Sequence, residues 1–131
     1  MTKLMNELLT EINEDVSLLK TKYQSSAALR LLFSHAFDKE KVFILPDTDP
    51  PYKQGKHIVG MAPTTLTFEA KRLYIFCRAD LKPIKREAMF IDLLENLDDN
   101  EAKILLAVKN QTLHKLYPNI TKAKVKAAGF L

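Results

Sequence analysis

Residues 83–109 read PIKREAMFIDLLENLDDNEAKILLAVK, and this stretch predicts two helices in succession. Pro83 suits the first turn of a helix, because the N–H group that proline lacks has no partner there. Asp98 followed by Glu101 has the spacing of a capping box, with the aspartate as N-cap, and begins a second helix that runs through Lys109. We expect the first helix to bury its apolar residues Phe90, Leu93, Leu94 and Leu97.

The chain before this stretch predicts a long N-terminal helix and a shorter one. Residues 3–23 place apolar side chains at alternating steps of four and three, a heptad-like seam. The seam is short, so a helix docked on its own domain is favoured over a coiled-coil dimer; we expect a monomer, or a weak dimer through residues 5–23. Ser25 or Ser26 can cap the next helix, which runs through Phe37. The seam consists of Met5, Leu9, Ile12, Val16, Leu19 and Tyr23.

A further helix is predicted to start at Thr64 or Thr65. A strand is the alternative for residues 73–77, which have a strong β composition. On a helical wheel, Phe68 and Ile75 lie together on the side opposite the inward face. The inward face consists of Leu66, Ala70, Leu73 and Cys77, at steps of four, three and four.

The remaining segments are irregular or short. Residues 42–45 fit a brief strand or an extended segment. Residues 46–63 hold four of the six prolines and two of the three glycines, which predicts a long irregular loop. Thr121 can cap a last short helix that Gly129 ends, with a strand as the alternative. The sequence therefore predicts one domain over residues 1–131. We expect a mainly α, compact bundle of about five to six helices with a long proline-rich loop, and one short strand or hairpin is left open as an alternative.

The composition excludes several classes of protein. Apolar residues make up 47% of the 131 residues and charged residues 27%, as in an ordinary folded protein in water. The apolar runs are too short to span a bilayer, and no secretion signal is visible. Cys77 is the single cysteine, so neither an internal disulfide nor a thiolate zinc cluster can form. We expect a protein of the cell interior.

No arrangement of residues points to catalysis or to a cofactor. His35, His57 and His114 are scattered and lack the spacing of metal ligands. Cys77 is expected to be buried on the apolar face of its helix and to behave as an inert thiol. Only three glycines are present, which excludes a P-loop and a dinucleotide fingerprint. We therefore expect a protein that is not an enzyme, with no metal site and no cofactor.

Positive charge gathers in the second half of the chain. Residues 1–60 carry eight Lys or Arg and eight Asp or Glu, whereas residues 61–131 carry twelve and eight, which accounts for the net charge of +4. This asymmetry favours an anionic partner, although a solubilising lysine-rich surface is the alternative. The candidate residues for binding nucleic acid or an acidic protein partner are Lys71, Arg72, Arg78, Lys85, Arg86, Lys122 and Lys126.

Aromatic residues accompany these cations at two places. Phe68 and Ile75 would form a second apolar strip bordered by Lys71 and Arg72, unless the helix is simply sandwiched between others. In the proline-rich loop, Tyr52 beside Lys53 can stack on a base and neutralise a phosphate. The alternative is a solvated loop with the tyrosine packed onto the core.

Scattered short motifs over about residues 29–125 resemble a small uncharacterised protein family of myovirus-type tailed bacteriophages. No activity or site residue is established for that family, so the resemblance implies only expression in the cytoplasm of an infected bacterial cell. The motifs that carry it are Phe33, Phe37, Ile44-Leu45-Pro46, Pro50-Pro51-Tyr52-Lys53, Arg72-Leu73-Tyr74, Lys85-Arg86-Glu87, Phe90, Leu93-Leu94-Glu95, Ala102-Lys103, Leu105-Leu106, Tyr117-Pro118 and Thr121.

Two functions follow as hypotheses. The first is a non-catalytic phage-type accessory protein that binds nucleic acid, or a protein of the replication or transcription machinery, through its basic C-terminal half. The alternative is a virion-assembly or structural protein of a tailed phage.

Overall fold

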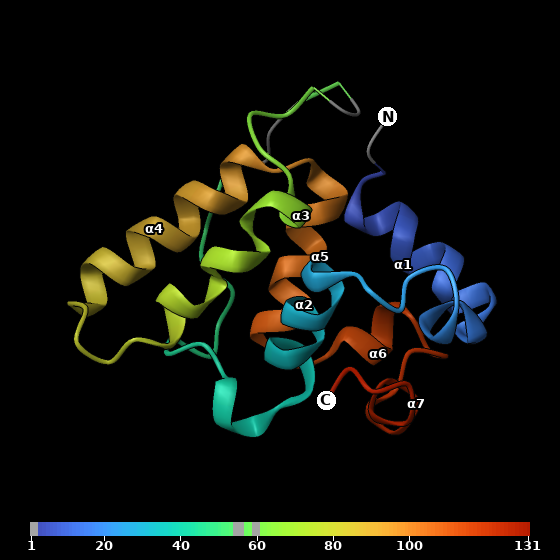
Figure 1. Cartoon of the computed structure of the whole chain (residues 1–131). Helices are drawn as coiled ribbons and strands as arrows, with labels where there is room; N and C mark the ends of the chain where they lie inside the picture. Colours follow the sequence, from blue (N-terminus) through green and yellow to red (C-terminus); the bar gives the residue numbers. More distant parts are fainter. Residues whose placement is uncertain (1–2, 54–56, 59–60) are drawn as a thin grey trace.

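The computed structural model describes residues 3–53, 57–58 and 61–131, and it is helical throughout its regular parts (Figure 1). Within these residues no β-strand occurs, so the predicted mainly α fold is confirmed and the strand alternatives are wrong. The α-helices are α1 (Met5–Glu14), α2 (Ala27–Phe37), α3 (Leu66–Glu69), α4 (Pro83–Asn96), α5 (Asp99–Lys109), α6 (Leu113–Leu116) and α7 (Lys122–Ala127); the 3-10 helices are η1 (Val16–Lys20), η2 (Lys39–Lys41) and η3 (Ala70–Cys77).

The core lies around α2, which contacts both α5 and η3. Apart from Leu4 and Ala70, the buried apolar side chains of the described residues form one cluster, and aromatic rings join its parts. The Phe76 ring lies 5.3 Å from that of Phe43 and 5.2 Å from that of Phe90, measured between centroids. These rings tie the extended residues 42–45 and η3 to α4. The backbone N–H of Ile44 reinforces the junction by donating to the carbonyl oxygen of Phe76 at 2.8 Å.

The predicted single helix over residues 3–23 is wrong, because the chain breaks at Asp15. Its backbone is extended, and its carboxylate accepts a hydrogen bond from the N–H of Ser17. Asp15 thereby caps η1, which begins at Val16. A short polar side chain that bonds its own backbone competes with helix continuation in this way. The seam still packs into the core of its own chain, with Met5, Leu9, Ile12 and Leu19 fully buried. A coiled-coil dimer through residues 5–23 would need these side chains on the surface.

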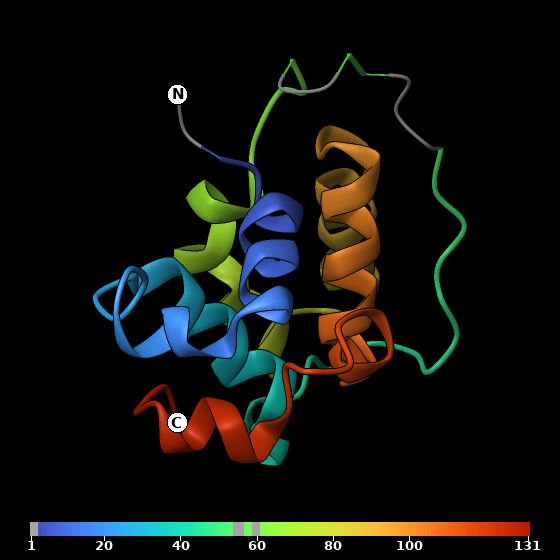
Figure 2. The same cartoon turned by 90° about the vertical axis from the view of Figure 1, so that its right-hand side faces the viewer.

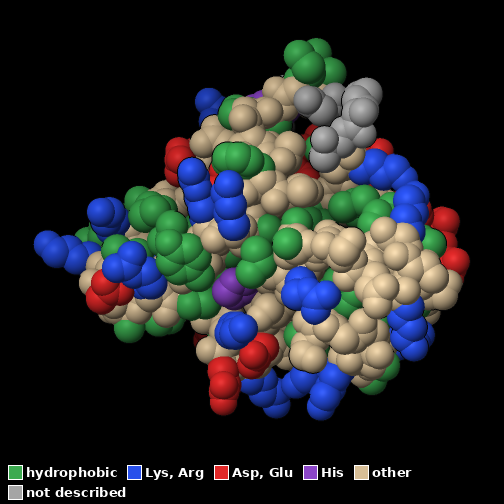
Figure 3. Space-filling view, viewed as in Figure 1, with side chains coloured by type: hydrophobic (Ala, Val, Ile, Leu, Met, Phe, Trp, Pro, Cys, Tyr) green, Lys and Arg blue, Asp and Glu red, His purple; other side chains and the backbone are tan. Residues whose placement is uncertain are grey.

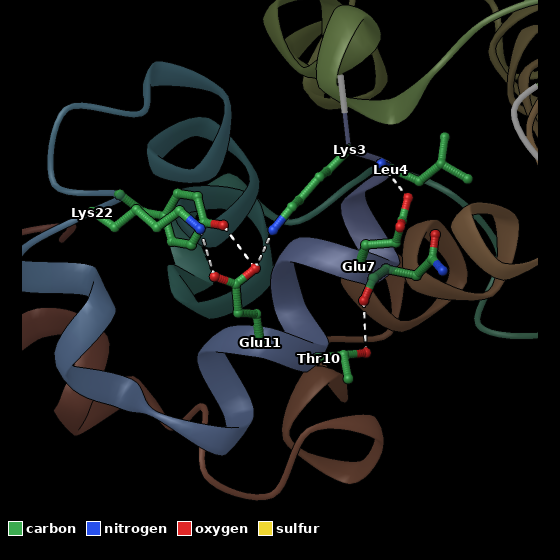
Figure 4. Close-up of polar contacts among 8 residues, drawn as sticks. Lys3, Leu4, Glu7, Thr10, Glu11 and Lys22 are labelled. Atoms are coloured by element: carbon green, nitrogen blue, oxygen red, sulfur yellow. Dashed lines mark hydrogen bonds and ion pairs between the residues drawn. The ribbon is translucent and has the colours of Figure 1, made fainter. Parts of the chain in front are cut away.

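Glu11 holds the two parts of this broken helix together (Figure 4). Its carboxylate accepts hydrogen bonds from Lys3 Nζ at 2.6 Å, Lys22 Nζ at 2.8 Å and Tyr23 Oη at 2.9 Å. The bond from Lys22 contributes most to lowering the pKa of Glu11 to about 2. The residues after η1 are thereby fixed to the solvent side of α1.

The junction of α4 and α5 agrees with the sequence only in part. Pro83 occupies the first turn of α4, and Asp98 caps α5 by accepting a hydrogen bond from the N–H of Asn100 at 3.0 Å. The predicted capping box is wrong, because Glu101 does not turn back to Asp98. Its carboxylate is fully buried and accepts hydrogen bonds from the N–H of Met5 at 2.7 Å and of Leu66 at 3.1 Å. One side chain of α5 therefore satisfies the first turns of both α1 and α3.

Two other helix ends form as predicted. Ser26 caps α2 by accepting from the N–H of Leu29, and Thr121 caps α7 by accepting from the N–H of Lys124. Gly129 ends α7 with a φ of 86°, which glycine adopts without steric cost. The N–H of the next residue, Phe130, then bonds back to the carbonyl oxygen of Val125 at 3.1 Å, completing a Schellman motif.

The described residues of the 46–63 segment form neither helix nor strand, as predicted. Gly55 and Gly60 lie outside the described residues. Figure 2 shows residues 46–53 on the side of the molecule away from α3. The segment is anchored to α4, because Glu95 accepts the backbone N–H of Lys53 through its carboxylate and contacts His57 Nε2 through its carbonyl oxygen.

Candidate functional site

The 3-10 winding of η3 determines which side chains reach the surface. Such a helix has three residues per turn, so side chains three positions apart stand directly above one another. The sequence predicted the position of this helix correctly and its winding wrongly. The buried row is Ala70, Leu73 and Phe76, at steps of three, and Phe76 takes the place expected for Cys77.

A second row projects into solvent and carries two aromatic rings. We call Phe68, Lys71 and Tyr74 the exposed ridge. Phe68 is 52% exposed and Tyr74 is 56% exposed. The Lys71 ammonium lies 4.6 Å from the centroid of the Phe68 ring, and the Arg72 guanidinium carbon lies 5.6 Å from it. Figure 3 looks onto this side of the molecule, where basic and hydrophobic side chains lie next to each other over α3 and η3.

The third row faces α4 and forms one wall of a groove. Its members are Glu69, Arg72 and Ile75, so the predicted strip that joined Phe68 to Ile75 is wrong. The groove has a volume of about 340 Å³, and buried Leu73 and Phe76 lie at its base. The opposite wall consists of Met89, Asp92, Leu93 and Asn96 of α4.

The other basic candidates close to η3 differ in whether their charged groups are exposed and free to contact a ligand. Lys85 is exposed, and Arg78 is exposed but forms a two-bond pair with Asp80, with Nη2 to Oδ2 at 2.6 Å and Nε to Oδ1 at 3.0 Å. This hydrogen-bonded pair raises the pKa of Arg78 and lowers that of Asp80. Arg86 is only 6% exposed, which contradicts a binding role. Its guanidinium donates to the carbonyl oxygens of Ile44, Arg78 and Leu81 and holds the turn before α4.

The remaining candidates lie on other parts of the surface. Lys122 and Lys126 are exposed on α7 and line a separate hollow of about 580 Å³ next to α2. In Figure 1, α2 lies between α7 and the α3–η3 segment. Tyr52 packs against the core and Lys53 is exposed, both in the segment that Figure 2 places away from α3. The structure therefore brings Lys71 and Arg72 together with Phe68 but does not form one surface from all nine candidates.

Cys77 is half-buried, so its predicted full burial is wrong. Its sulfur lies 3.3 Å from the carbonyl oxygen of Lys41 and 3.7 Å from His35 Nδ1. Burial raises the pKa of the Cys77 thiol and lowers that of His35. His35 Nδ1 also lies 3.1 Å from the Lys41 carbonyl oxygen. A carbonyl oxygen only accepts hydrogen bonds, so Nδ1 carries a hydrogen and donates it, and this nitrogen cannot act as a base toward the thiol.

Sequence reasoning missed Tyr74 and Asp92 as surface groups. The signal for Tyr74 was the spacing of Ala70, Leu73 and Phe76, which repeats every three residues and indicates a 3-10 helix. Asp92 becomes notable only when η3 is placed opposite α4. Among the described residues, no cluster of three or more His, Cys, Asp or Glu side chains is arranged to hold a metal ion.

The comparisons with known proteins identify a family and no activity. No helix in the described parts of the chain has the length and apolar content needed to cross a bilayer. No curated protein and no solved structure matches the chain. One family matches residues 5–115, a range that includes the exposed ridge and the groove but not α7. The chain therefore belongs to a family of unknown function, DUF6433.

Proposed function

We propose that the protein is a non-catalytic accessory protein that binds single-stranded nucleic acid through the exposed ridge of α3 and η3. The observation that carries this proposal is the half-exposed ring of Phe68 with the cations of Lys71 and Arg72 beside it. Exposed aromatic rings next to cations are the usual means of binding single strands, because the rings stack on bases and the cations neutralise phosphates.

The geometry of the ridge favours a single strand over a duplex. The two rings belong to residue 68 of α3 and residue 74 of η3. Rises of about 1.5 Å per residue in the α-helix and about 2.0 Å in the 3-10 helix place them roughly 11 Å apart along the axis. Separate bases of one strand can stack on rings at this distance. A duplex presents its phosphates and groove edges, whereas the flat faces of its bases are covered by their neighbours. Each stacked base contributes about 1–3 kcal/mol.

The resemblance to a phage family suggests where this binding takes place. We propose the cytoplasm of an infected bacterial cell, where viral and host single strands arise during replication and transcription. The ridge is then a general contact to the strand, and the surrounding lysines add affinity without reading sequence.

Fluorescence anisotropy with a labelled oligothymidine tests the proposal. Phe68→Ala should weaken binding roughly 5- to 150-fold, which corresponds to the loss of one stacked base. Lys71→Ala should reduce the slope of log affinity against log salt by about 0.7, the value for one phosphate of a single strand. Arg78→Ala should change this slope less than Arg72→Ala, because Arg78 is paired with Asp80.

The matched control is Lys115→Ala, which removes an exposed lysine from α6, outside the ridge. In a protein that carries Lys115→Ala, the further change Phe68→Ala should weaken binding by the same factor as it does in the wild type. If no oligonucleotide binds at about 50 mM salt, the proposal is wrong, and the ridge is then a contact for a protein partner or for virion assembly.

A further inference from the structure

The groove between η3 and α4 offers hydrogen-bonding groups that match guanine, and we infer that it binds one guanine base of the strand held by the exposed ridge. This inference rests on the proposed function and specifies the ligand of the adjoining site. At about 340 Å³ the groove is large enough for a base, and its volume lies within the range of small-molecule sites. Its half-buried apolar side chains, Ile75, Met89 and Leu93, can contact the faces of a planar ring.

Two charged side chains of opposite sign line the two walls. Arg72 belongs to η3 and Asp92 to α4, and both are exposed at the groove. No ion pair joins them, so the guanidinium nitrogens and the carboxylate oxygens lie more than 4.0 Å apart. Within the described part of the chain, the Asp92 carboxylate has no hydrogen-bond partner, and the Arg72 guanidinium has no hydrogen bond or ion pair and lies over the Phe68 ring. Both groups are therefore available to a ligand placed between them.

Asn96 is the third polar side chain of the groove that has hydrogen-bonding groups without a partner among the described residues. Its backbone carbonyl oxygen accepts the N–H of Thr64, whereas its side-chain amide forms no hydrogen bond with any described residue. By contrast, Glu69 already accepts a hydrogen bond from Thr64 Oγ1 at 2.9 Å. The groove thus presents one fork of donors, the unpaired carboxylate of Asp92, the carboxylate of Glu69 with one oxygen already bonded, and one amide that can donate or accept.

This set of groups distinguishes guanine from the other bases. Arginine bonds the O6 and N7 acceptors of guanine with two parallel donors. A carboxylate only accepts, so it matches two adjacent donors, and guanine presents these as N1–H and its N2 amino group. Adenine and cytosine place an acceptor beside their amino group, and the single N–H of thymine or uracil lies between two carbonyl oxygens. Each of these would face the Asp92 carboxylate with at least one oxygen or nitrogen lone pair.

Arg72 connects the groove to the exposed ridge. It is the only residue described as lining the groove that also lies over the Phe68 ring. A strand that stacks one base on Phe68 therefore has the groove beside it for another base of the same strand. The ridge supplies affinity for any sequence, and the groove supplies preference for guanine.

Anisotropy with matched oligonucleotides tests the inference. An oligothymidine with one central guanine should bind roughly 5- to 150-fold more tightly than oligothymidine itself, and one with central adenine should not. Hypoxanthine lacks the N2 amino group and should recover only part of the gain. Asp92→Asn, which replaces one acceptor by a donor at equal size and removes one negative charge, should abolish the preference, so that the guanine and adenine oligonucleotides bind equally. The matched control is Glu40→Gln, since Glu40 is an exposed acid on η2.

The outcomes separate this inference from the proposed function. Equal binding of the guanine and adenine oligonucleotides, with tight binding of both, would overturn the guanine groove and leave the ridge. If no oligonucleotide binds, guanosine monophosphate is titrated while backbone amide NMR shifts are recorded. Shifts confined to residues 69–76 and 89–96, and absent with adenosine monophosphate, would support the groove alone. Absent or equal shifts with the two nucleotides would overturn it.

Discussion

Glu101→Ala should destabilise the fold more than any other single change to a polar side chain of α5. The variant leaves the N–H groups of Met5 and Leu66 without their acceptor at a fully buried position. Each buried donor left unpaired costs about 1–3 kcal/mol, which gives about 2–6 kcal/mol for the two. The loss of a buried carboxylate, whose pKa is raised by burial, offsets part of this cost. We therefore expect a net loss of about 2–4 kcal/mol.

Urea unfolding followed by circular dichroism measures this loss as a lower midpoint at an unchanged slope. The matched control is Asp98→Ala, which removes one capping bond from the same helix and should cost about 1 kcal/mol. Equal midpoints for wild type and Glu101→Ala would refute the role of Glu101 as an acceptor for two helices.

The pH dependence provides a second measurement on the same pair of proteins. Because the pKa of Glu101 is raised in the folded state, its contribution to stability is fully present below its ordinary value of 4.5. The contribution is lost as the pH rises through the raised value. The free-energy difference between wild type and Glu101→Ala should therefore be larger at about pH 4 than at about pH 8. A difference that grows with pH would contradict the direction of this shift.

Two further predictions concern Arg86 and Cys77. Arg86→Lys should lose about 2–3 kcal/mol in urea unfolding, because one ammonium cannot reach the three carbonyl oxygens that the guanidinium bonds, whereas Lys85→Ala should change stability by less than about 0.5 kcal/mol. Equal effects of the two changes would show that the buried bonds of Arg86 are not needed. Cys77 should react slowly with a disulfide reagent at neutral pH and faster in denaturant, because burial raises the pKa of its thiol; labelling at the unfolded rate in buffer would contradict this.

The sequence predicted those parts of the fold that depend on neighbouring residues. Ser26, Asp98 and Thr121 each cap a helix a few residues away, and Pro83 begins α4, because these preferences need no tertiary contact. The break at Asp15 and the 3-10 winding of η3 were missed. Both occur where apolar spacing fitted an α-helix, and packing or a local side-chain bond determined the outcome.

The candidate site was predicted only as far as local chemistry allowed. Lys71 and Arg72 lie on the surface beside Phe68, as the charge pattern indicated. The same pattern included Arg86, whose partner carbonyl at Ile44 is 42 residues away in the chain. Glu101 likewise reaches Met5 across 96 residues. Partners at such separations are fixed by the tertiary fold, so the charge of a side chain does not show whether it meets solvent or the core.

The bond from Glu101 to Met5 has a consequence for protein synthesis. The buried N–H of Met5 in the N-terminal helix has no acceptor until Glu101 is synthesised, 96 residues later. At about 5–20 residues per second, this takes roughly 5–20 s on the ribosome. During this interval Met5, Leu9 and Ile12 lack the α5 surface that covers them in the folded chain. The nascent segment is therefore a predicted substrate for chaperones that bind apolar stretches at the ribosome exit, and a slowed ribosome would prolong that exposure.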